Sequence, residues 1–203
     1  MPARRAHAPE LHKRILDATR TLLDEINFDA LTVADILTAA QVSRASFYFY
    51  FPSKQAVLGE LVRAAVGQGQ DAAEPYLDPD GDPIDGLRHG IRTGANLWRE
   101  NAGVLVAIVD AWQSDADLRA LWLAQMDTFT DATVARITAD PRAMAYLEGH
   151  DIRAIAATLT WTGERLYYLA AAEVPPFDDD KTLIDALTHS WTSTLYGIAT
   201  PRS

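Results

Sequence analysis

Two short helices separated by a tight turn are the feature that most constrains how this chain can fold. Thr32 and Asp35 have the three-residue spacing of a capping box, in which each side chain bonds to the other residue's backbone amide, so a helix is predicted from Val33. Ser43 supplies the cap of a second helix, which must end before Pro52 because proline clashes with the preceding helical turn. The segment is therefore predicted to form two helices joined by only a few residues.

The rest of the chain is predicted to be helical as well. Apolar residues near the start recur at spacings of four, three, four and four, which is typical of one face of an amphipathic helix: Leu11, Ile15, Ala18, Leu22 and Ile26. Further helical patterns cover residues 54–73, most of 85–139, 151–172 and 179–195, with breaks at Pro, Gly, Asn and Asp positions. No strand pattern of useful length occurs. We expect an all-α fold of about nine helices.

Charge is distributed unevenly along the chain. The net charge is −10, yet residues 1–62 carry seven basic and seven acidic side chains, and the acidic excess lies entirely in the remainder. Because DNA binding depends on Lys and Arg, this leaves room for DNA contacts only near the N-terminus. The chain has no cysteine, no apolar export signal and no run of eighteen apolar residues, so we expect a cytoplasmic protein without a membrane span.

Residues 32–54 match the geometry of a helix-turn-helix, whose second helix enters the major groove of DNA. Ile36, Phe47 and Phe51 are predicted to seat this second helix on its neighbours. An isolated aromatic run such as 47–51 is more often core than functional. In a domain this small, however, five consecutive aromatic residues point all around a helix, so some must face outward.

The outward side chains of the second helix are predicted to contact DNA. Tyrosine hydroxyls and the Lys54 ammonium group suit phosphate oxygens, and Arg44 suits guanine or phosphate. Arg4 and Arg5 are candidates for a mobile arm. If Gln41 in the turn has a positive φ, it costs about 1 kcal/mol. The predicted DNA-contacting residues are Thr32, Ser43, Arg44, Ala45, Ser46, Tyr48, Phe49, Tyr50 and Lys54.

Residues 32–57 resemble the signature of the TetR family, in which a Thr-capped helix, an Ala-x-Val-Ser turn and a Tyr-x-x-Phe-x-x-Lys run follow one another. The run Phe-Tyr-Phe-Tyr-Phe-Pro-Ser-Lys at 47–54 especially resembles the mycobacterial, EthR-like subgroup. The resemblance implies a transcriptional repressor with a DNA-binding domain over residues 1–53. It also implies that residues 54–203 bind a small lipophilic effector and form a homodimer through the last two helices, on double-stranded operator DNA.

The residues themselves give modest support to an effector pocket. Trp122, Met126, Phe129 and Thr133 share one helical face, a pattern that an ordinary core stripe would also produce. With the resemblance, the predicted pocket residues are Ile91, Trp98, Trp122, Met126, Phe129, Thr133, Thr160, Gly163, Glu164, Tyr168 and Trp191.

Within the pocket set, the resemblance places Thr160 and Gly163 where the subgroup has ligand-binding asparagines, so the ligand's identity does not carry over. Glu164 next to Arg165 favours a structural ion pair over a ligand contact.

Other classes of function find little support. The five histidines are scattered, and neither a Gly-x-Ser-x-Gly motif nor a glycine-rich phosphate loop occurs, so we expect no enzyme, cofactor or metal. The acidic run 78–82 resembles a calcium loop, but His89 stands where a bidentate Glu is needed. A constitutive dimeric DNA-binding regulator without a ligand remains the alternative hypothesis.

Overall fold

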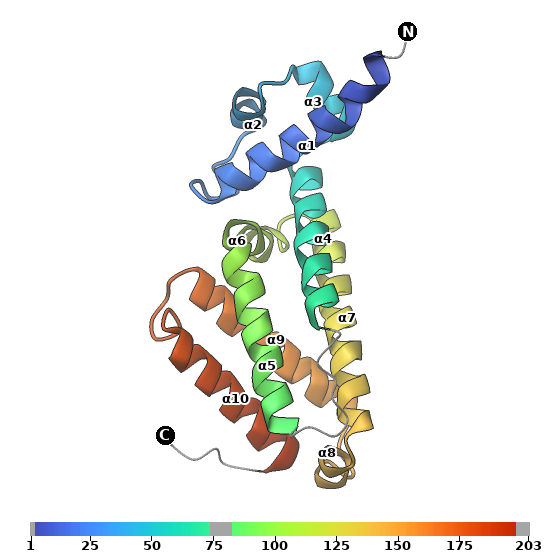
Figure 1. Cartoon of the computed structure of the whole chain (residues 1–203), viewed down its shortest axis with the longest axis vertical. Helices are drawn as coiled ribbons and strands as arrows, with labels where there is room; N and C mark the ends of the chain where they lie inside the picture. Colours follow the sequence, from blue (N-terminus) through green and yellow to red (C-terminus); the bar gives the residue numbers. More distant parts are fainter. Residues whose placement is uncertain (1–2, 74–82, 198–203) are drawn as a thin grey trace. The chain divides into compact units, whose positions relative to one another are not determined.

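The computed structural model describes residues 3–73 and 83–197, with side chains over 9–67 and 84–197. Within these ranges the chain forms ten α-helices and no strand, so the all-α prediction is confirmed (Figure 1). None of the described helices is both long enough and apolar enough to cross a lipid bilayer. The helices are α1 (Ala3–Leu23), α2 (Val33–Ala40), α3 (Arg44–Tyr50), α4 (Lys54–Ala73), α5 (Pro83–Glu100), α6 (Ala102–Ala111), α7 (Ala116–Ala139), α8 (Pro141–Tyr146), α9 (Ile152–Ala171) and α10 (Asp180–Tyr196).

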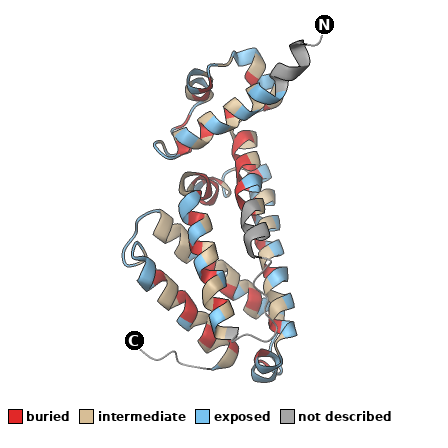
Figure 2. Ribbon diagram, viewed as in Figure 1, coloured by how far each residue is buried: buried red, intermediate tan, exposed pale blue. Residues whose placement is uncertain are grey.

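The short helix α8 is the one that the expected nine did not include. The Asp140 side chain caps it by accepting hydrogen bonds from the amides of Arg142 and Ala143, at 2.8 and 3.4 Å. Pro141 stands in the first turn, where its missing N–H needs no partner. The Asp-Pro pair therefore starts a helix as well as ending α7. Most of α8 is exposed, as its pale blue colour shows (Figure 2).

The chain divides into two compact units, one of residues 1–68 with 101–121 and one of residues 69–100 with 122–203. The division between them falls inside α4 and α7. These units are defined by packing. The functional division into residues 1–53 and 54–203 stays a prediction.

In the first unit, α1 packs against α2, α3 and α6. Its apolar stripe supplies the fully buried Ile15, and its C-terminal turn approaches α6 so closely that a Cβ atom at Gly103 would lie 2.6 Å from the carbonyl oxygen of Leu23. Only glycine permits that approach. Arg20 adds a polar tie by donating to the Asn101 side chain over 2.9 Å. These contacts fix α1 as the support for the two short helices.

In the second unit, α10 packs against α5, α8 and α9. Two apolar clusters form the interior: one joins α5 to α10 through Leu87, Ile91, Ala95, Leu183 and Leu187, and the other joins the end of α7, α8, α9 and α10 through Ile137, Ala143, Leu147, Ala156, Leu159 and Leu195. Trp191 of α10 packs against both clusters. The unit is thus a helical bundle with a continuous apolar interior.

Candidate functional site

The capping box at the start of α2 forms as predicted. The amide of Asp35 donates to the Thr32 hydroxyl over 3.2 Å, and the amide and hydroxyl of Thr32 donate to the Asp35 carboxylate over 2.9 and 2.6 Å. The bond from the Thr32 hydroxyl, followed by that from its amide, lowers the pKa of Asp35. The Thr32 side chain is exposed but already serves this cap.

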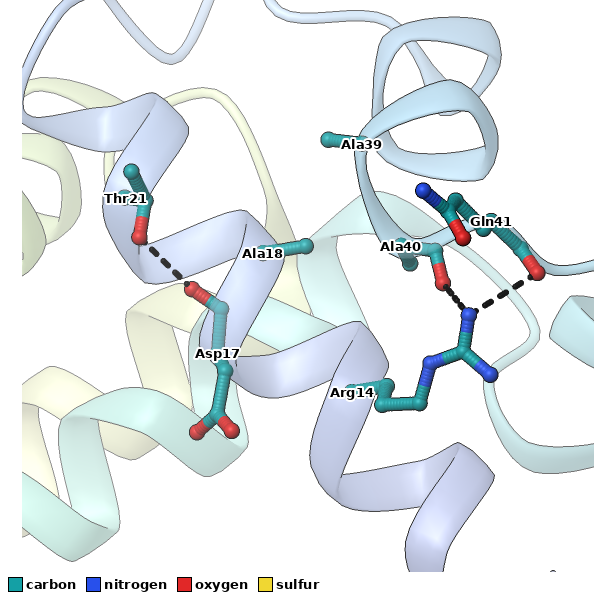
Figure 3. Close-up of a pocket in the computed structure, with 7 residues that line it drawn as sticks. All are labelled: Arg14, Asp17, Ala18, Thr21, Ala39, Ala40 and Gln41. Atoms are coloured by element: carbon teal, nitrogen blue, oxygen red, sulfur yellow. Dashed lines mark hydrogen bonds between the residues drawn. The ribbon is translucent and has the colours of Figure 1, made fainter.

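The turn between α2 and α3 depends on Gln41, whose φ of 52° and ψ of 48° lie in the left-handed region. The φ of Gln41 is therefore positive, at the cost of about 1 kcal/mol expected for a residue other than glycine. Arg14 of α1 donates to the carbonyl oxygens of Ala40 and Gln41, the second over 3.1 Å (Figure 3). The arginine therefore holds a turn in which glycine would be unstrained.

A shallow groove of about 380 Å³ lies at this contact between α1 and α2 (Figure 3). Its lining is Arg14, Asp17, Ala18, Thr21, Ala39, Ala40 and Gln41. The Arg14 guanidinium spans the groove to reach the two carbonyl groups, so the groove is part of the support for the turn.

Helix α3 has a buried side and an exposed side. Ser43 caps it by accepting from the Ser46 amide over 3.1 Å. Phe47 is fully buried and Phe51 is 3% exposed, as predicted for the residues that seat the helix. Arg44 and Ala45 are exposed.

The other aromatic residues of the run separate by exposure. The exposed fraction is 49% for Tyr48 and 79% for Phe49. Tyr50 is half-buried, with its ring centroid 5.7 Å from that of His12. The prediction that part of the aromatic run faces outward is confirmed, and Phe49 is the most exposed of its members.

Lys54 occupies a different environment from the rest of the predicted DNA-contacting set. Its ammonium group donates to the carbonyl oxygens of Phe28 and Leu31, both over 2.7 Å, and to that of Asp29 over 3.3 Å. It also lies 4.6 Å from the centroid of the Phe28 ring. The three ammonium hydrogens therefore serve the loop that joins α1 to α2. The predicted phosphate contact of Lys54 stays a prediction.

His12 is a supporting residue that sequence reasoning missed. Its ring stacks on Phe51 with 4.9 Å between centroids, and its Nε2 atom lies 3.1 and 3.2 Å from the two carboxylate oxygens of Glu60 in α4. The available signal was its position three residues before Ile15, close to the apolar stripe of α1. The side chains of Arg4 and Arg5, the candidate arm, and the acidic run 78–82 lie outside the described residues.

In the second unit, a residue that was not predicted, Tyr167, contacts two of the predicted pocket residues, Trp98 and Ile91. Trp98 is buried, and its ring lies edge-on to Trp122 with 6.4 Å between centroids. Tyr167 stacks on Trp98, also at 6.4 Å, and its hydroxyl donates to the carbonyl oxygen of Ile91 over 3.0 Å. Tyr167 is half-buried as a residue, and burial raises the pKa of its hydroxyl.

Tyr168, the neighbouring residue that was predicted for the pocket, has a different contact, and its pocket role stays a prediction. The guanidinium of Arg165 lies 4.9 Å from the centroid of the Tyr168 ring, which is half-buried. The signal that could have found Tyr167 is its three-residue spacing from Glu164, which puts the two residues on one side of α9.

The stripe along α7 becomes less buried towards its C-terminal end. Met126 is buried like Trp122, whereas Phe129 and Thr133 are half-buried. The Thr133 hydroxyl lies 3.5 Å from that of Thr160 in α9, and each also donates to a carbonyl group of its own helix. These two hydroxyls, one on α7 and one on α9, are therefore near neighbours.

Glu164 is the buried ionisable residue of this region. Only 3% of its side chain is exposed, and its Oε2 atom lies 3.8 Å from Nε of Arg165, a loose ion pair of the kind predicted. Burial raises the pKa of Glu164, while Arg165 and the nearby indole of Trp122 act in the opposite direction. The indole N–H and the carboxyl group nevertheless do not meet in a hydrogen bond of normal geometry. Gly163 beside it is buried and has room for a methyl group, which would lie 3.6 Å from the Tyr167 ring.

Two family models match this chain. Residues 15–61 match "Bacterial regulatory proteins, tetR family", and residues 87–197, more than half of the chain, match "Transcriptional regulator EthR, C-terminal domain". Curated relatives include the HTH-type transcriptional regulator EthR of Mycobacterium tuberculosis, 30% identical over 90% of this chain and 86% of its own. The EthR of Mycolicibacterium smegmatis is 29% identical over 90% and 85%.

Solved structures have the same fold. A TetR-family regulator from Syntrophomonas wolfei has a TM-score of 0.74 at 15% identity, covering 95% of this chain and 99% of its own. The TetR-family repressor FadR of Thermus thermophilus, solved with lauroyl-CoA, has a TM-score of 0.67 at 22% identity, covering 95% and 97%. The two structures show the fold, and the family models together with the 30% identical relative settle the family. The chain belongs to the TetR family of bacterial regulatory proteins and carries a C-terminal domain of the EthR type.

Proposed function

We propose that this transcriptional regulator is a homodimeric repressor that leaves its operator when a small lipophilic ligand binds to its helical body. The observation that carries the DNA-binding part is the division of α3 into a buried side, with Phe47 and Phe51, and an exposed side, with Arg44, Ala45 and Phe49. A helix seated in this way presents its N-terminal side chains to the major groove.

Within α3 we assign different tasks to the exposed side chains. Arg44 is in the first turn, where a guanidinium group can pair with the major-groove edge of guanine. The Tyr48 hydroxyl suits a phosphate oxygen, and Ser43, Ala45, Ser46, Phe49 and Tyr50 complete the surface together with Thr32. We assign Lys54 to positioning, because its ammonium group holds the α1–α2 loop.

The test is a gel shift on DNA from the upstream intergenic region, with salt titration and excess non-specific competitor. Tyr48→Phe should weaken binding to all sequences alike, whereas Arg44→Ala should lose about 1–3 kcal/mol of preference at one base position. Circular dichroism of each variant checks that the fold is retained. Unchanged operator affinity in both variants would refute the assignment of these residues.

We propose that the homodimer forms through the last two helices, α9 and α10, as the family resemblance implies, and the operator logic of helix-turn-helix proteins supports a two-fold dimer. A two-fold dimer places its two recognition helices in half-sites about 34 Å apart, one turn of DNA, or at a multiple of it. Light scattering coupled to size exclusion should give twice the chain mass of 22.3 kDa. A monomer at concentrations that bind the operator would contradict the proposal.

The ligand part is supported by the aromatic group of Trp98, Trp122 and Tyr167. The TetR-family repressor FadR of Thermus thermophilus was solved in complex with lauroyl-CoA, and this supports a lipophilic effector for the present chain. The proposed dimer exchanges between a form whose two recognition helices fit the half-sites and a form in which their spacing does not fit. An effector that binds more tightly to the second form would increase its population and so release the DNA.

Quenching of tryptophan fluorescence by lipophilic compounds, followed by release of DNA in the gel shift, tests this part. Trp122→Ala should alter ligand affinity and spare operator recognition. If operator binding is specific but no lipophile quenches fluorescence or releases DNA, the constitutive alternative holds, and the aromatic group is only core.

A further inference from the structure

We propose that Phe49 determines part of the operator sequence, because its ring contacts the C5 methyl group of a thymine in each half-site. This inference rests on the proposed DNA-binding function and specifies one base that the operator contains. The contact is apolar, so it adds to the hydrogen bonds that Arg44 is proposed to make with guanine.

The first support is the exposure of an apolar ring on the helix that is assigned to the major groove. Phe49 is 79% exposed, the largest exposed fraction among the large hydrophobic side chains of the described residues. Phenylalanine is usually buried, because removing its ring from water contributes favourable free energy. Phe47 and Phe51 are buried and already seat α3. The Phe49 ring is therefore not needed to hold the helix and is available to a partner.

The second support is an apolar row beside a polar row on the exposed side of α3. Residues four apart lie on the same face of a helix, so Ala45 and Phe49 form the apolar row, and Arg44 and Tyr48 form the polar row. The apolar row offers a methyl group and a phenyl ring, neither of which can bind a phosphate oxygen. Thymine is the base that presents a methyl group in the major groove, and apolar side chains contact it there. The apolar row therefore suits thymine.

The third support is a set of ring contacts that orients Phe49 despite its exposure. The Phe49 ring lies edge-on to Tyr50, with 5.0 Å between centroids and 89° between the ring planes. Tyr50 in turn lies edge-on to His12, which stacks on the buried Phe51. A ring that is oriented before binding loses less conformational freedom when it meets a base.

The serine hydroxyls of this segment are engaged in capping α3. The Ser43 hydroxyl accepts a hydrogen bond from the Ser46 amide over 3.1 Å, and the two hydroxyl oxygens lie 2.9 Å apart. Arg44 and Phe49 are therefore the side chains of α3 that we assign to reading bases, with Tyr48 on phosphate. A half-site that contains both guanine and thymine follows from this assignment.

The experiment starts from an operator that is selected from random-sequence duplexes by repeated binding to the full-length protein. Each thymine is then replaced by deoxyuridine, which lacks only the C5 methyl group, at symmetric positions of the two half-sites. Gel-shift titration measures the affinity of each duplex. We expect one position at which the replacement weakens binding by about fourfold for each half-site, the factor that corresponds to the burial of one methyl group.

A second set of duplexes tests the methyl group in a different base pair. At the sensitive position, the thymine–adenine pair is replaced by cytosine–guanine and by 5-methylcytosine–guanine. These two duplexes present the same hydrogen-bonding groups and differ in the methyl group. The methylated duplex should bind more tightly, again by about fourfold for each half-site.

The variants assign the methyl effect to one side chain. Phe49→Ala removes the ring and should reduce the effect of deoxyuridine to less than about twofold, whereas Phe49→Leu keeps an apolar contact and should retain most of it. Tyr48→Phe is the matched control on the polar row: it should weaken all duplexes alike and retain the full methyl effect. Circular dichroism checks that each variant is folded.

The outcomes are distinguishable. An operator with no methyl-sensitive position, or a methyl effect of the same size in Phe49→Ala and the wild type, would overturn this inference and leave the DNA-binding proposal standing. Failure of the selection to enrich any duplex that resists non-specific competitor would overturn both. A methyl effect that is lost in Phe49→Ala and retained in Tyr48→Phe supports the inference.

Discussion

Replacing Lys54 with Met should destabilise the first unit, because the Lys54 ammonium group holds the α1–α2 loop. The substitution keeps an apolar stem of similar length and removes the donors to the carbonyl oxygens of Phe28, Asp29 and Leu31. The prediction separates two roles for Lys54, loop anchor and phosphate ligand, which have different measurable consequences.

The magnitude follows from the surroundings of each carbonyl group. Hydrogen bonds to a charged donor contribute about 1.5–3 kcal/mol each, but the bond to Asp29 is exposed and long, and the freed carbonyl groups can accept water. Loss of the cation–π contact with the Phe28 ring adds about 0.5–1 kcal/mol. The unfolding free energy should therefore fall by about 2–3 kcal/mol in total.

Urea unfolding followed by circular dichroism, at one fixed protein concentration, measures the stability. Lys13→Met is the matched control, because Lys13 is exposed and pairs with Asp17 on the same helix face, so its loss should change stability by about 0.5 kcal/mol or less. Operator affinity against salt should keep the wild-type slope in Lys54→Met. Unchanged stability together with a salt slope smaller by about 0.9 would refute the anchor role and make Lys54 a phosphate ligand.

Two further predictions concern the second unit. Gly94→Ala should cost about 1–3 kcal/mol, because a Cβ atom there would lie 2.7 Å from the Tyr167 hydroxyl, whereas Gly90→Ala, with its nearest contact at 3.8 Å, should stabilise the helix slightly; urea unfolding of both variants is the check. Burial raises the pKa of Asp140, but hydrogen bonds from Tyr196 and two amides outweigh it and lower the pKa overall, while burial and this bond raise the pKa of Tyr196 to about 12. Tyr196→Phe should therefore lose about 1 kcal/mol at neutral pH. This difference should start to decline below about pH 4 and above about pH 10, and it should be lost as the pH falls through the lowered pKa of Asp140 or rises through the pKa of Tyr196 at about 12; a constant difference across pH would contradict the pairing.

The DNA-binding segment was predictable from sequence because its signals are local. The Thr32–Asp35 capping box and the Ser43 cap each depend on residues three apart, and the structure confirms both. Phe47 and Phe51 were predicted to be buried because they are apolar and seat the helix, and the impossibility of burying five consecutive aromatic residues predicted that others face outward. By contrast, the partners of Lys54 lie more than twenty residues away, and no spacing in the sequence indicates them.

The body of the protein was less predictable because its contacts join distant helices. Periodicity predicted the α7 stripe that contains Trp122. It could not show that Tyr167 rather than Tyr168 stacks on Trp98, because the rotation of α9 about its own axis decides which of the two adjacent side chains faces Trp98. The short α8 was missed because Pro141 signals a helix start as readily as a break. Which of the predicted pocket residues touch a ligand stays a prediction.

The two-sided character of α3 has a consequence for how such regulators diversify. Phe47 and Phe51 hold the helix in place, while Arg44, Ala45 and Phe49 point away from the protein. Exposed positions without packing partners tolerate substitution at little cost in folding free energy. On the proposed assignment of these residues to DNA contacts, a gene duplicate could acquire a new operator by changing these few codons, without passing through unstable intermediates and without altering the helical body.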